Sequence, residues 1–304
     1  MGLALGLFTA TMWGTLPVML KILVGWLDVY TITWCRFFLA GLLLLPLAVR
    51  TGGFKRLVNL RGVPVVLLVF SVLGLTGNYL TFMGGLSFIS PGTAQIVIQL
   101  SPVFMLLAGL LVFGERFSLL QCAGLALVLI GIALFFSPRY DLLMAELKTK
   151  GLGVLLMVTS ALLWGTYMVT QKQLLQDLHA EVILVVIYLG GALLMVPFIE
   201  LPSLAVLPPL GIGLLLASSV MTMGSYLTFA MALEHVEASR IGVLVSLTPI
   251  LVMINVELAL WWRPGLLEPE FLPAISLLGA VAVVVGSSIG ALGRRQRPVP
   301  EQPA

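Results

Sequence analysis

The sequence predicts an all-α polytopic membrane protein with ten transmembrane helices in two inverted five-helix repeats. Of its 304 residues, 60% are hydrophobic and only 10% are charged, and the mean hydropathy is +1.13. Soluble domains usually carry about 25% charged residues, so these values exclude a soluble fold for the whole chain. Motifs of the first half also recur in the second half, which predicts a duplication.

Ten apolar segments are long enough to cross a bilayer. A membrane helix needs about 20 mostly apolar residues for a hydrocarbon layer of about 30 Å. The first segment begins without a basic region before it, so we expect a retained helix and not a cleaved signal peptide. The expected spans are residues 3–24, 31–49, 63–83, 93–113, 119–136, 152–172, 181–198, 209–232, 239–260 and 272–292.

Four motifs of the first half recur in the same order in the second half. The pairs, at offsets of 151, 147, 147 and 155 residues, are Trp13-Gly14-Thr15 with Trp164-Gly165-Thr166, residues 77–82 with 224–229, Leu100-Ser101-Pro102 with Leu247-Thr248-Pro249, and Gly124 and Gly131 with Gly279 and Gly286. Because each half holds five spans, the second half enters the membrane with opposite polarity, a pattern typical of secondary transporters. We expect a first repeat over residues 1–137, a connector over 138–150, a second repeat over 151–293 and a cytoplasmic tail over 294–304.

Residues 86–134 hold two apolar runs that are joined by a charged corner at Gly114-Glu115-Arg116. Gly124 and Gly131, a heptad apart, offer a face for close helix packing. Together with Pro91-Gly92-Thr93-Ala94, Leu100-Ser101-Pro102 and Leu111–Arg116, they match a family pattern in order and spacing. The stretch closely resembles the EamA-type ten-helix branch of the drug/metabolite transporter superfamily. The resemblance implies that helices one to four of each half surround a central substrate cavity and that the fifth lies outside it.

The second half departs from this pattern after Thr248-Pro249. The offset grows by eight residues here, and the segment reads Trp261-Trp262-Arg263-Pro264-Gly265 before Glu268 and Glu270. Glu115 matches Glu270 at the later offset and Trp262 at the earlier one. Both alignments stay open, and so does the role of this corner.

Loop charges and cysteines indicate location and topology. Of the 16 Lys and Arg residues, ten are expected on the same side of the membrane as the N-terminus and five on the opposite side. This bias predicts a multi-pass protein of the cell inner or plasma membrane with both termini in the cytoplasm. Cys35 and Cys122 both fall in expected spans, so a disulfide framework is not expected. The net charge of +3 comes mostly from loops and does not indicate nucleic-acid binding.

These features predict a secondary transporter that moves a small metabolite, such as an amino acid or an amphipathic cation, by alternating access, as an exporter. The chain has no G-x-x-x-x-G-K-[ST] loop for ATP-driven transport. An intramembrane enzyme is not expected either, because Glu234-His235 lacks the second His of an H-E-x-x-H zinc site. We expect no cofactor or metal, and as partners a small-molecule substrate and the lipid bilayer; a homodimer stays open. The alternative is a membrane receptor or assembly subunit without transport activity.

Polar and aromatic residues of helices one, three, four and their repeats are the candidates for substrate binding. Gln95 and Gln99 are four residues apart and share one helix face, which must point inward because an amide facing lipid is costly. The alternative for the whole set is ordinary packing and hydrogen bonding between helices. The candidates are Trp13, Thr15, Asn78, Tyr79, Gln95, Gln99, Trp164, Tyr167 and Tyr226.

Arg36 and Glu257 are the charged residues that fall clearly within expected spans. Such charges are costly and mark function by default. Under the expected topology, Arg36 lies about 8 Å and Glu257 about 5 Å from the outer surface, at about 1.5 Å per residue. We therefore expect an ion pair that gates or couples transport. The alternative is that Arg36 caps nearby carbonyls and that Glu257 reaches interfacial water.

Overall fold

The computed structural model describes residues 2–51, 54–101, 104, 118–139, 150–235, 244–245, 247–267 and 273–292. Over these residues the regular structure is helical, without a strand. The Gly114-Glu115-Arg116 corner, most of the expected connector, the pair Glu268 and Glu270, and the tail lie outside the described residues. The count of ten spans and the nature of the altered corner therefore stay predictions.

Seven helices in the described part of the chain are long and apolar enough to cross a membrane. They are α1 (Gly2–Leu23), α2 (Val29–Arg50), α4 (Val63–Phe88), α7 (Leu119–Phe136), α9 (Lys150–Leu174), α10 (Ala180–Met195), which η3 extends to Phe198, and α12 (Pro209–His235). Two shorter apolar stretches lie in α14 (Thr248–Trp262) and α15 (Ala274–Leu292). The expected fourth span is described only at its start, as α5 (Pro91–Val97) and the 3-10 turn η1 (Ile98–Leu100). The remaining elements are short: α3 (Phe54–Val58), η2 (Ser137–Arg139), η3 (Val196–Phe198) and α11 (Leu201–Ala205).

Polar caps set where several helices begin. The Asp28 side chain accepts a hydrogen bond from the Thr31 amide at 2.8 Å and starts α2. Ser118 and Gln121 form a reciprocal capping box at the start of α7. Each cap satisfies amides that a helix leaves unpaired at its first turn, where membrane-embedded protein offers few other acceptors.

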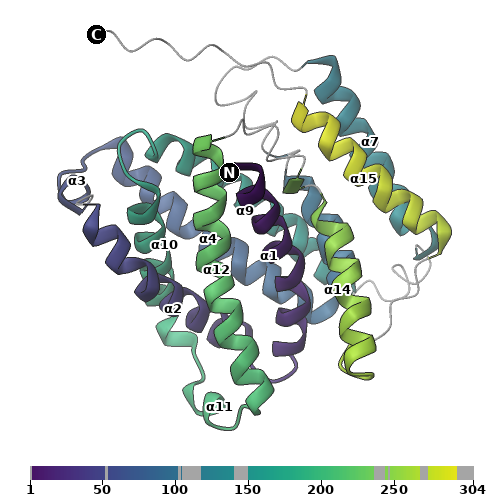
Figure 1. Cartoon of the computed structure of the whole chain (residues 1–304), viewed down its shortest axis with the longest axis horizontal. Coiled ribbons are helices and arrows are strands. Elements are labelled where there is room, and N and C mark those ends of the chain that lie inside the picture. The colour runs from purple at the N-terminus through teal and green to yellow at the C-terminus, as the bar shows by residue number, and fades with distance from the viewer. Residues whose placement is uncertain are drawn as a thin grey trace.

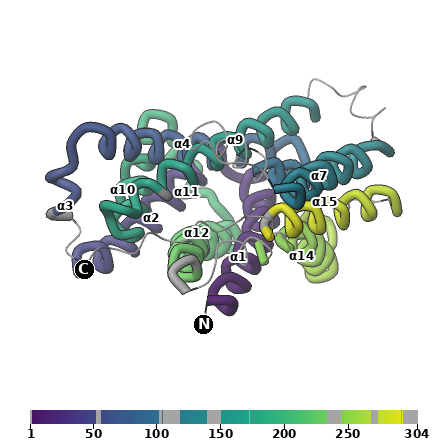
Figure 2. The backbone as a smooth tube through the Cα atoms, turned by 90° about the horizontal axis from the view of Figure 1, so that it is seen from above, coloured from purple at the N-terminus to yellow at the C-terminus, as the bar shows by residue number. Residues whose placement is uncertain are grey.

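The helices pack as pairs that join the two halves of the chain (Figure 1). α1 lies along α12, α4 along α9, α2 along α10, α5 against α14, and α7 along α15. Figure 2 shows α7 and α15 together at one end of the molecule, beside α14. The other paired helices form the larger body, which contains the main buried core.

Glycines allow α7 and α15 to approach closely. A Cβ added to Gly124 would lie 2.6 Å from the Gly286 carbonyl oxygen, and one added to Gly131 would lie 2.7 Å from that of Gly279. In both cases the two nearest atoms belong to the backbone, which cannot move aside as a flexible side chain can. The close-packing face that the sequence predicts at Gly124 and Gly131 is therefore confirmed, and its partner is α15.

Hydrogen bonds between side chains link two of the other helix pairs. Asn78 of α4 donates to the carbonyl oxygen and to the hydroxyl of Ser160 in α9, at 2.9 and 2.8 Å. In the α1–α12 pair, the hydroxyls of Thr9 and Thr228 lie 2.8 Å apart. These contacts fix the rotation of each helix about its axis, and that rotation decides which side chains face the centre.

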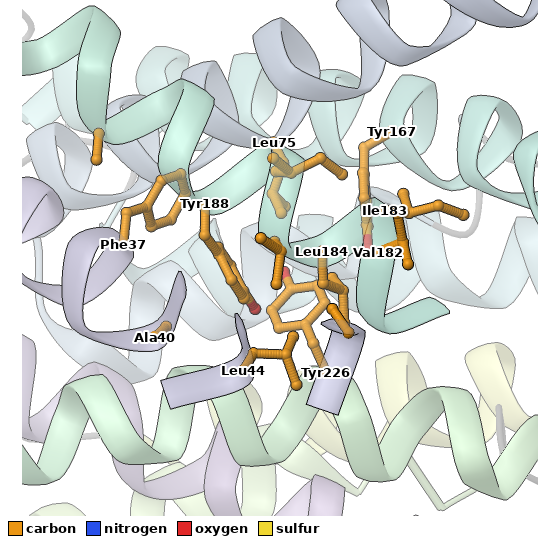
Figure 3. Close-up of a cluster of buried hydrophobic side chains, with 14 of the residues drawn as sticks. Phe37, Ala40, Leu44, Leu75, Tyr167, Val182, Ile183, Leu184, Tyr188 and Tyr226 are labelled. Atoms are coloured by element: carbon orange, nitrogen blue, oxygen red, sulfur yellow. The ribbon is translucent and has the colours of Figure 1, made fainter. Parts of the chain in front are cut away.

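The main core contains tyrosines as well as aliphatic residues (Figure 3). Tyr167, Tyr188 and Tyr226 lie among side chains such as Leu75 and Leu184. The Tyr188 hydroxyl donates to the Thr222 carbonyl oxygen at 3.2 Å. Tyr226 also lines the cavity described next, and Tyr167 and Tyr188 pack behind it.

Candidate functional site

A cavity of about 160 Å³ lies between the helices of the larger body and is lined from both halves of the chain. Its walls come from α1, α2, α4, α5 with η1, α9, α12 and α14, together with Val245. Neither α7 nor α15 contributes a lining residue. The α7–α15 pair thus lies outside the cavity, which is the place that the family resemblance implies for the expected last helix of each half.

Aromatic rings form much of the wall. Trp13 and Trp164, which are 151 residues apart, both line the cavity, as do Tyr79 and Tyr226, which are 147 residues apart. The Trp13 ring lies edge-on to Tyr226 at 5.6 Å between centroids, and Tyr79 lies 6.2 Å from Tyr226. Rings at such distances hold one another in place and offer an apolar surface to a ligand.

The two glutamines also reach the cavity. Gln95 in α5 and Gln99 in η1 are 7% and 6% exposed, and both line it. Because they are four residues apart in a nearly continuous helix, their side chains project in the same direction. The inward orientation expected from the cost of an amide in lipid is what the structure shows; a role in substrate binding stays a prediction.

At two places on the cavity wall, the hydroxyl of a residue that precedes a proline bonds a backbone carbonyl. Pro102 and Pro249 have no N–H to bond the carbonyl four residues earlier, at Ile98 and Val245. The hydroxyl of Ser101 donates to the Ile98 carbonyl instead, at 2.7 Å, and Thr248 donates to Val245. Both hydroxyl residues and both carbonyl residues line the cavity. The sequence signal was the repeated Ser/Thr-Pro pair, whose polar side chains now have a defined partner.

Arg36 places a positive charge in the cavity wall. It is 2% exposed, and its Nε and Nη2 donate to the Thr222 hydroxyl oxygen at 3.1 and 2.8 Å. The Thr222 hydroxyl itself donates a hydrogen bond to the Ser218 carbonyl oxygen at 2.7 Å, so its oxygen is free to accept from the guanidinium. The guanidinium carbon also lies 4.8 Å from the centre of the Tyr79 ring, within cation–π range.

The expected ion pair between Arg36 and Glu257 is not formed in this structure. Glu257 lies on an exposed face of α14, whereas Arg36 bonds Thr222 of α12. The physical reason is the helix order: α2 packs against α10 and α12, and α14 packs against α1 on the other side. Equal depth in the membrane did not make the two helices neighbours.

Two further candidates lie outside the cavity. The Thr15 hydroxyl donates to the Thr11 carbonyl at 2.9 Å and receives a bond from Asn255 of α14 at 3.4 Å. Thr15 follows Trp13 by two residues, about 200° around the helix, so the two cannot face the same space. Tyr167 is fully buried and packs against Tyr226, with 5.9 Å between ring centroids, in the layer behind the wall.

The structure also adds residues that sequence reasoning did not select. Phe82 lines the cavity, and so do Leu16, Pro17 and Leu20 of α1. Phe82 ends the repeated segment 77–82 and lies three to four residues after Asn78 and Tyr79, so helical spacing could have identified it. Thr222, which holds Arg36, carried no sequence signal, because its role depends on which helix packs against α2.

Comparison with protein-family models finds the EamA-like transporter family at residues 1–137 and 151–289. A Haemophilus influenzae protein named as an uncharacterized transporter is 34% identical over 298 residues, covering 98% of this chain and 97% of its own length. The Escherichia coli K12 protein named as the uncharacterized inner membrane transporter YhbE is 30% identical, covering 97% and 92%. A probable amino-acid metabolite efflux pump of E. coli K12 is 23% identical over 218 residues, covering 68% and 69%.

A solved crystal structure supports the same fold. It aligns with a TM-score of 0.66 over 96% of this chain and 98% of the other, at 20% identity. At this identity the similarity concerns the fold alone.

Proposed function

Because the chain belongs to the EamA-like transporter family, we propose that it moves a small metabolite across the cell inner membrane by alternating access, through the central cavity. It is a multi-pass membrane protein and a transporter rather than an enzyme. The observation that carries the proposal is one cavity lined by aromatic side chains from both halves of the chain, with amide and guanidinium groups from the first half. Substrate sites of secondary transporters commonly lie at such an interface between halves.

The helix contacts support an inverted repeat, with residues 1–137 and 151–293 as the two units, 138–150 as their connector and 294–304 as a tail. Exchanging the halves turns the α1–α12 pair into the α9–α4 pair and maps α2–α10, α5–α14 and α7–α15 onto themselves. Polar contacts follow the same rule. Thr9 of α1 bonds Ser225 and Thr228 of α12, and Ser160 of α9 bonds Asn78 of α4. Thr9 and Ser160 are 151 residues apart, and Asn78 and Ser225 are 147 residues apart, which are the offsets of the repeated motifs.

Symmetry-related halves give a physical route to alternating access. If the two halves can exchange their conformations, the cavity opens to one side of the membrane and then to the other. Helices with an interrupted hydrogen-bond ladder bend most readily, and here the breaks at Ile98 and Val245 lie on the cavity wall. The Lys and Arg bias supports cytoplasmic termini, and the relative named as an efflux pump supports outward transport.

A flux assay with a matched pair of variants tests the proposal. The purified protein is reconstituted into liposomes, and saturable uptake is measured for a panel of amino acids, organic acids and organic amines. Gln99→Leu removes an amide from the cavity, and Gln176→Leu makes the same change in an exposed turn. Since a lost buried hydrogen bond costs about 1–3 kcal/mol, Gln99→Leu should lower kcat/KM by roughly 5- to 150-fold. Gln176→Leu should leave it within about two-fold.

Two results would contradict the proposal. The absence of saturable flux above that of protein-free liposomes, for every compound, would remove transport as the function of this chain alone. Flux that Gln99→Leu leaves unchanged would remove the cavity as its substrate site.

A further inference from the structure

Arg36 is a buried cation whose contacts in the described part of the chain are all to neutral groups. The Thr222 hydroxyl accepts from two of its nitrogens, and the Tyr79 ring lies against its guanidinium. Moving a charge out of water into protein costs several kcal/mol unless an opposite charge compensates for it. No carboxylate among the described residues forms an ion pair with it. The protein therefore maintains a costly charge at the wall of its cavity.

The helix scaffold does not require this charge. Arg36 lies eight residues after the N-cap residue Asp28 of α2, and Ile187 lies eight residues after the N-cap residue His179 of α10. α2 and α10 pack along each other as related helices of the two halves. Ile187 is fully buried and apolar. Since the related position packs with an isoleucine, the guanidinium at residue 36 serves something other than helix packing.

The remaining donors of Arg36 fit a planar anion. A guanidinium carries five N–H donors in a fixed plane, and Thr222 occupies only the Nε and Nη2 groups on one side. Thr222 contacts one edge of the guanidinium plane and the Tyr79 ring contacts one face. The remaining N–H donors of Arg36 are therefore oriented before a ligand binds. A carboxylate matches this fork with two parallel hydrogen bonds.

The other side chains that line the cavity indicate the chemical class of ligand that carries the anionic group. Trp13, Phe82, Trp164 and Tyr226 supply apolar surface around the same cavity. Arg36 is the one charged side chain among its described lining residues. A cationic substrate would be repelled by this uncompensated charge, and a phosphate dianion would keep an unbalanced negative charge.

We propose that Arg36 is the anchor for a carboxylate on the substrate, and that the aromatic wall takes an apolar body attached to that carboxylate. This inference rests on the proposed function, because it assigns a substrate class to the same cavity. It selects organic carboxylates and excludes amphipathic amines.

Three ligands that share one body and differ in their head group test the assignment. Thermal unfolding of the purified protein is followed with phenylpropionate, phenylpropanol and phenylpropylamine. A ligand that binds the folded state raises Tm by an amount that grows with its concentration. Phenylpropionate should raise Tm in a saturable manner, and the alcohol and the amine should bind at least about tenfold more weakly, as expected for loss of a charge-assisted pair.

Two variants assign the effect to the guanidinium. Arg36→Met keeps most of the side-chain volume and should abolish the carboxylate-dependent shift while leaving the unliganded protein folded. Thr222→Val keeps the charge of Arg36 but removes the hydroxyl that orients the guanidinium. This variant should lower the affinity for phenylpropionate by about three- to tenfold. If Arg36→Met does not yield folded protein, Thr222→Val decides the question.

The outcomes separate this inference from the proposed function. Equal shifts from the carboxylate and the alcohol, no shift from any of the three, or an unchanged carboxylate affinity in Thr222→Val would overturn the inference. None of these results bears on flux through the cavity, which the Gln99→Leu comparison measures. A carboxylate shift that depends on Arg36, in a protein without flux, would keep the inference and reject transport.

Discussion

The α7–α15 interface gives a quantitative prediction, because its closest atoms belong to the backbone. In Gly286→Ala the new Cβ would lie 2.7 Å from the Gly124 carbonyl oxygen and 2.7 Å from the Val128 amide nitrogen. Ordinary contact begins at 3.4 Å, so the helices must separate by about 0.7 Å, and neither neighbouring atom can rotate away. Overpacking of this kind costs about 1–3 kcal/mol, and we expect about 2 kcal/mol.

The same helix provides a matched control. Gly290 lies one turn further along α15, and a Cβ built there meets nothing within 4 Å. Gly290→Ala should therefore be neutral or slightly stabilising, because alanine favours a helix over glycine by about 1 kcal/mol. Titration of each variant with a denaturing detergent, followed by circular dichroism, gives the two free energies of unfolding.

This pair of variants can refute the packing argument directly. Equal stability of Gly286→Ala and Gly290→Ala would show that α7 and α15 are not held at the distance described. Ligand affinity should be unchanged in both variants, since neither helix lines the cavity. A loss of affinity in Gly286→Ala at full stability would contradict the placement of this pair outside the site.

Three other substitutions test separate contacts. Lys21→Met removes an ammonium that donates to carbonyls at the C-terminal end of α4 and should cost about 1–2 kcal/mol of stability by the same titration; an unchanged midpoint would reject that cap. Ser160→Ala removes a hydroxyl that bonds Asn78 and should lower the free energy of unfolding by about 1 kcal/mol. A variant that is more stable than the native protein would contradict this contact. Glu257→Gln should change flux by less than about two-fold, because Glu257 is exposed and not bonded to Arg36. Loss of transport in this variant would show that Glu257 does take part in transport.

The sequence predicts best those features that depend on composition and spacing alone. For the glycines at 124 and 131 and the amides at 95 and 99, periodicity and the cost of misplacing them predict the direction in which they face. Both directions agree with the structure. Such arguments need only the nature of lipid and the geometry of one helix.

Features that depend on neighbouring helices were not predictable in this way. Trp164 and Tyr167 are three residues apart on α9, yet Trp164 reaches the cavity and Tyr167 packs behind it. The rotation of α9 is set by its contact with α4, where a Cβ on Gly74 would meet Tyr167 at 3.4 Å. The partner of Arg36 was missed for the same reason, since depth in a membrane does not say which helix lies alongside.

Access to one cavity residue from each side of the membrane distinguishes alternating access from a cavity that opens to one side only. Ser101 lines the cavity, and Ser101→Cys changes one atom; Cys35→Ala and Cys122→Ala remove the native thiols. The variant is treated with a membrane-impermeant thiol reagent in right-side-out and in inside-out vesicles. Alternating access predicts labelling from both sides, with protection by a transported compound in each case. Labelling from one side alone under all conditions, or labelling that no transported compound slows, would contradict alternating access through this cavity.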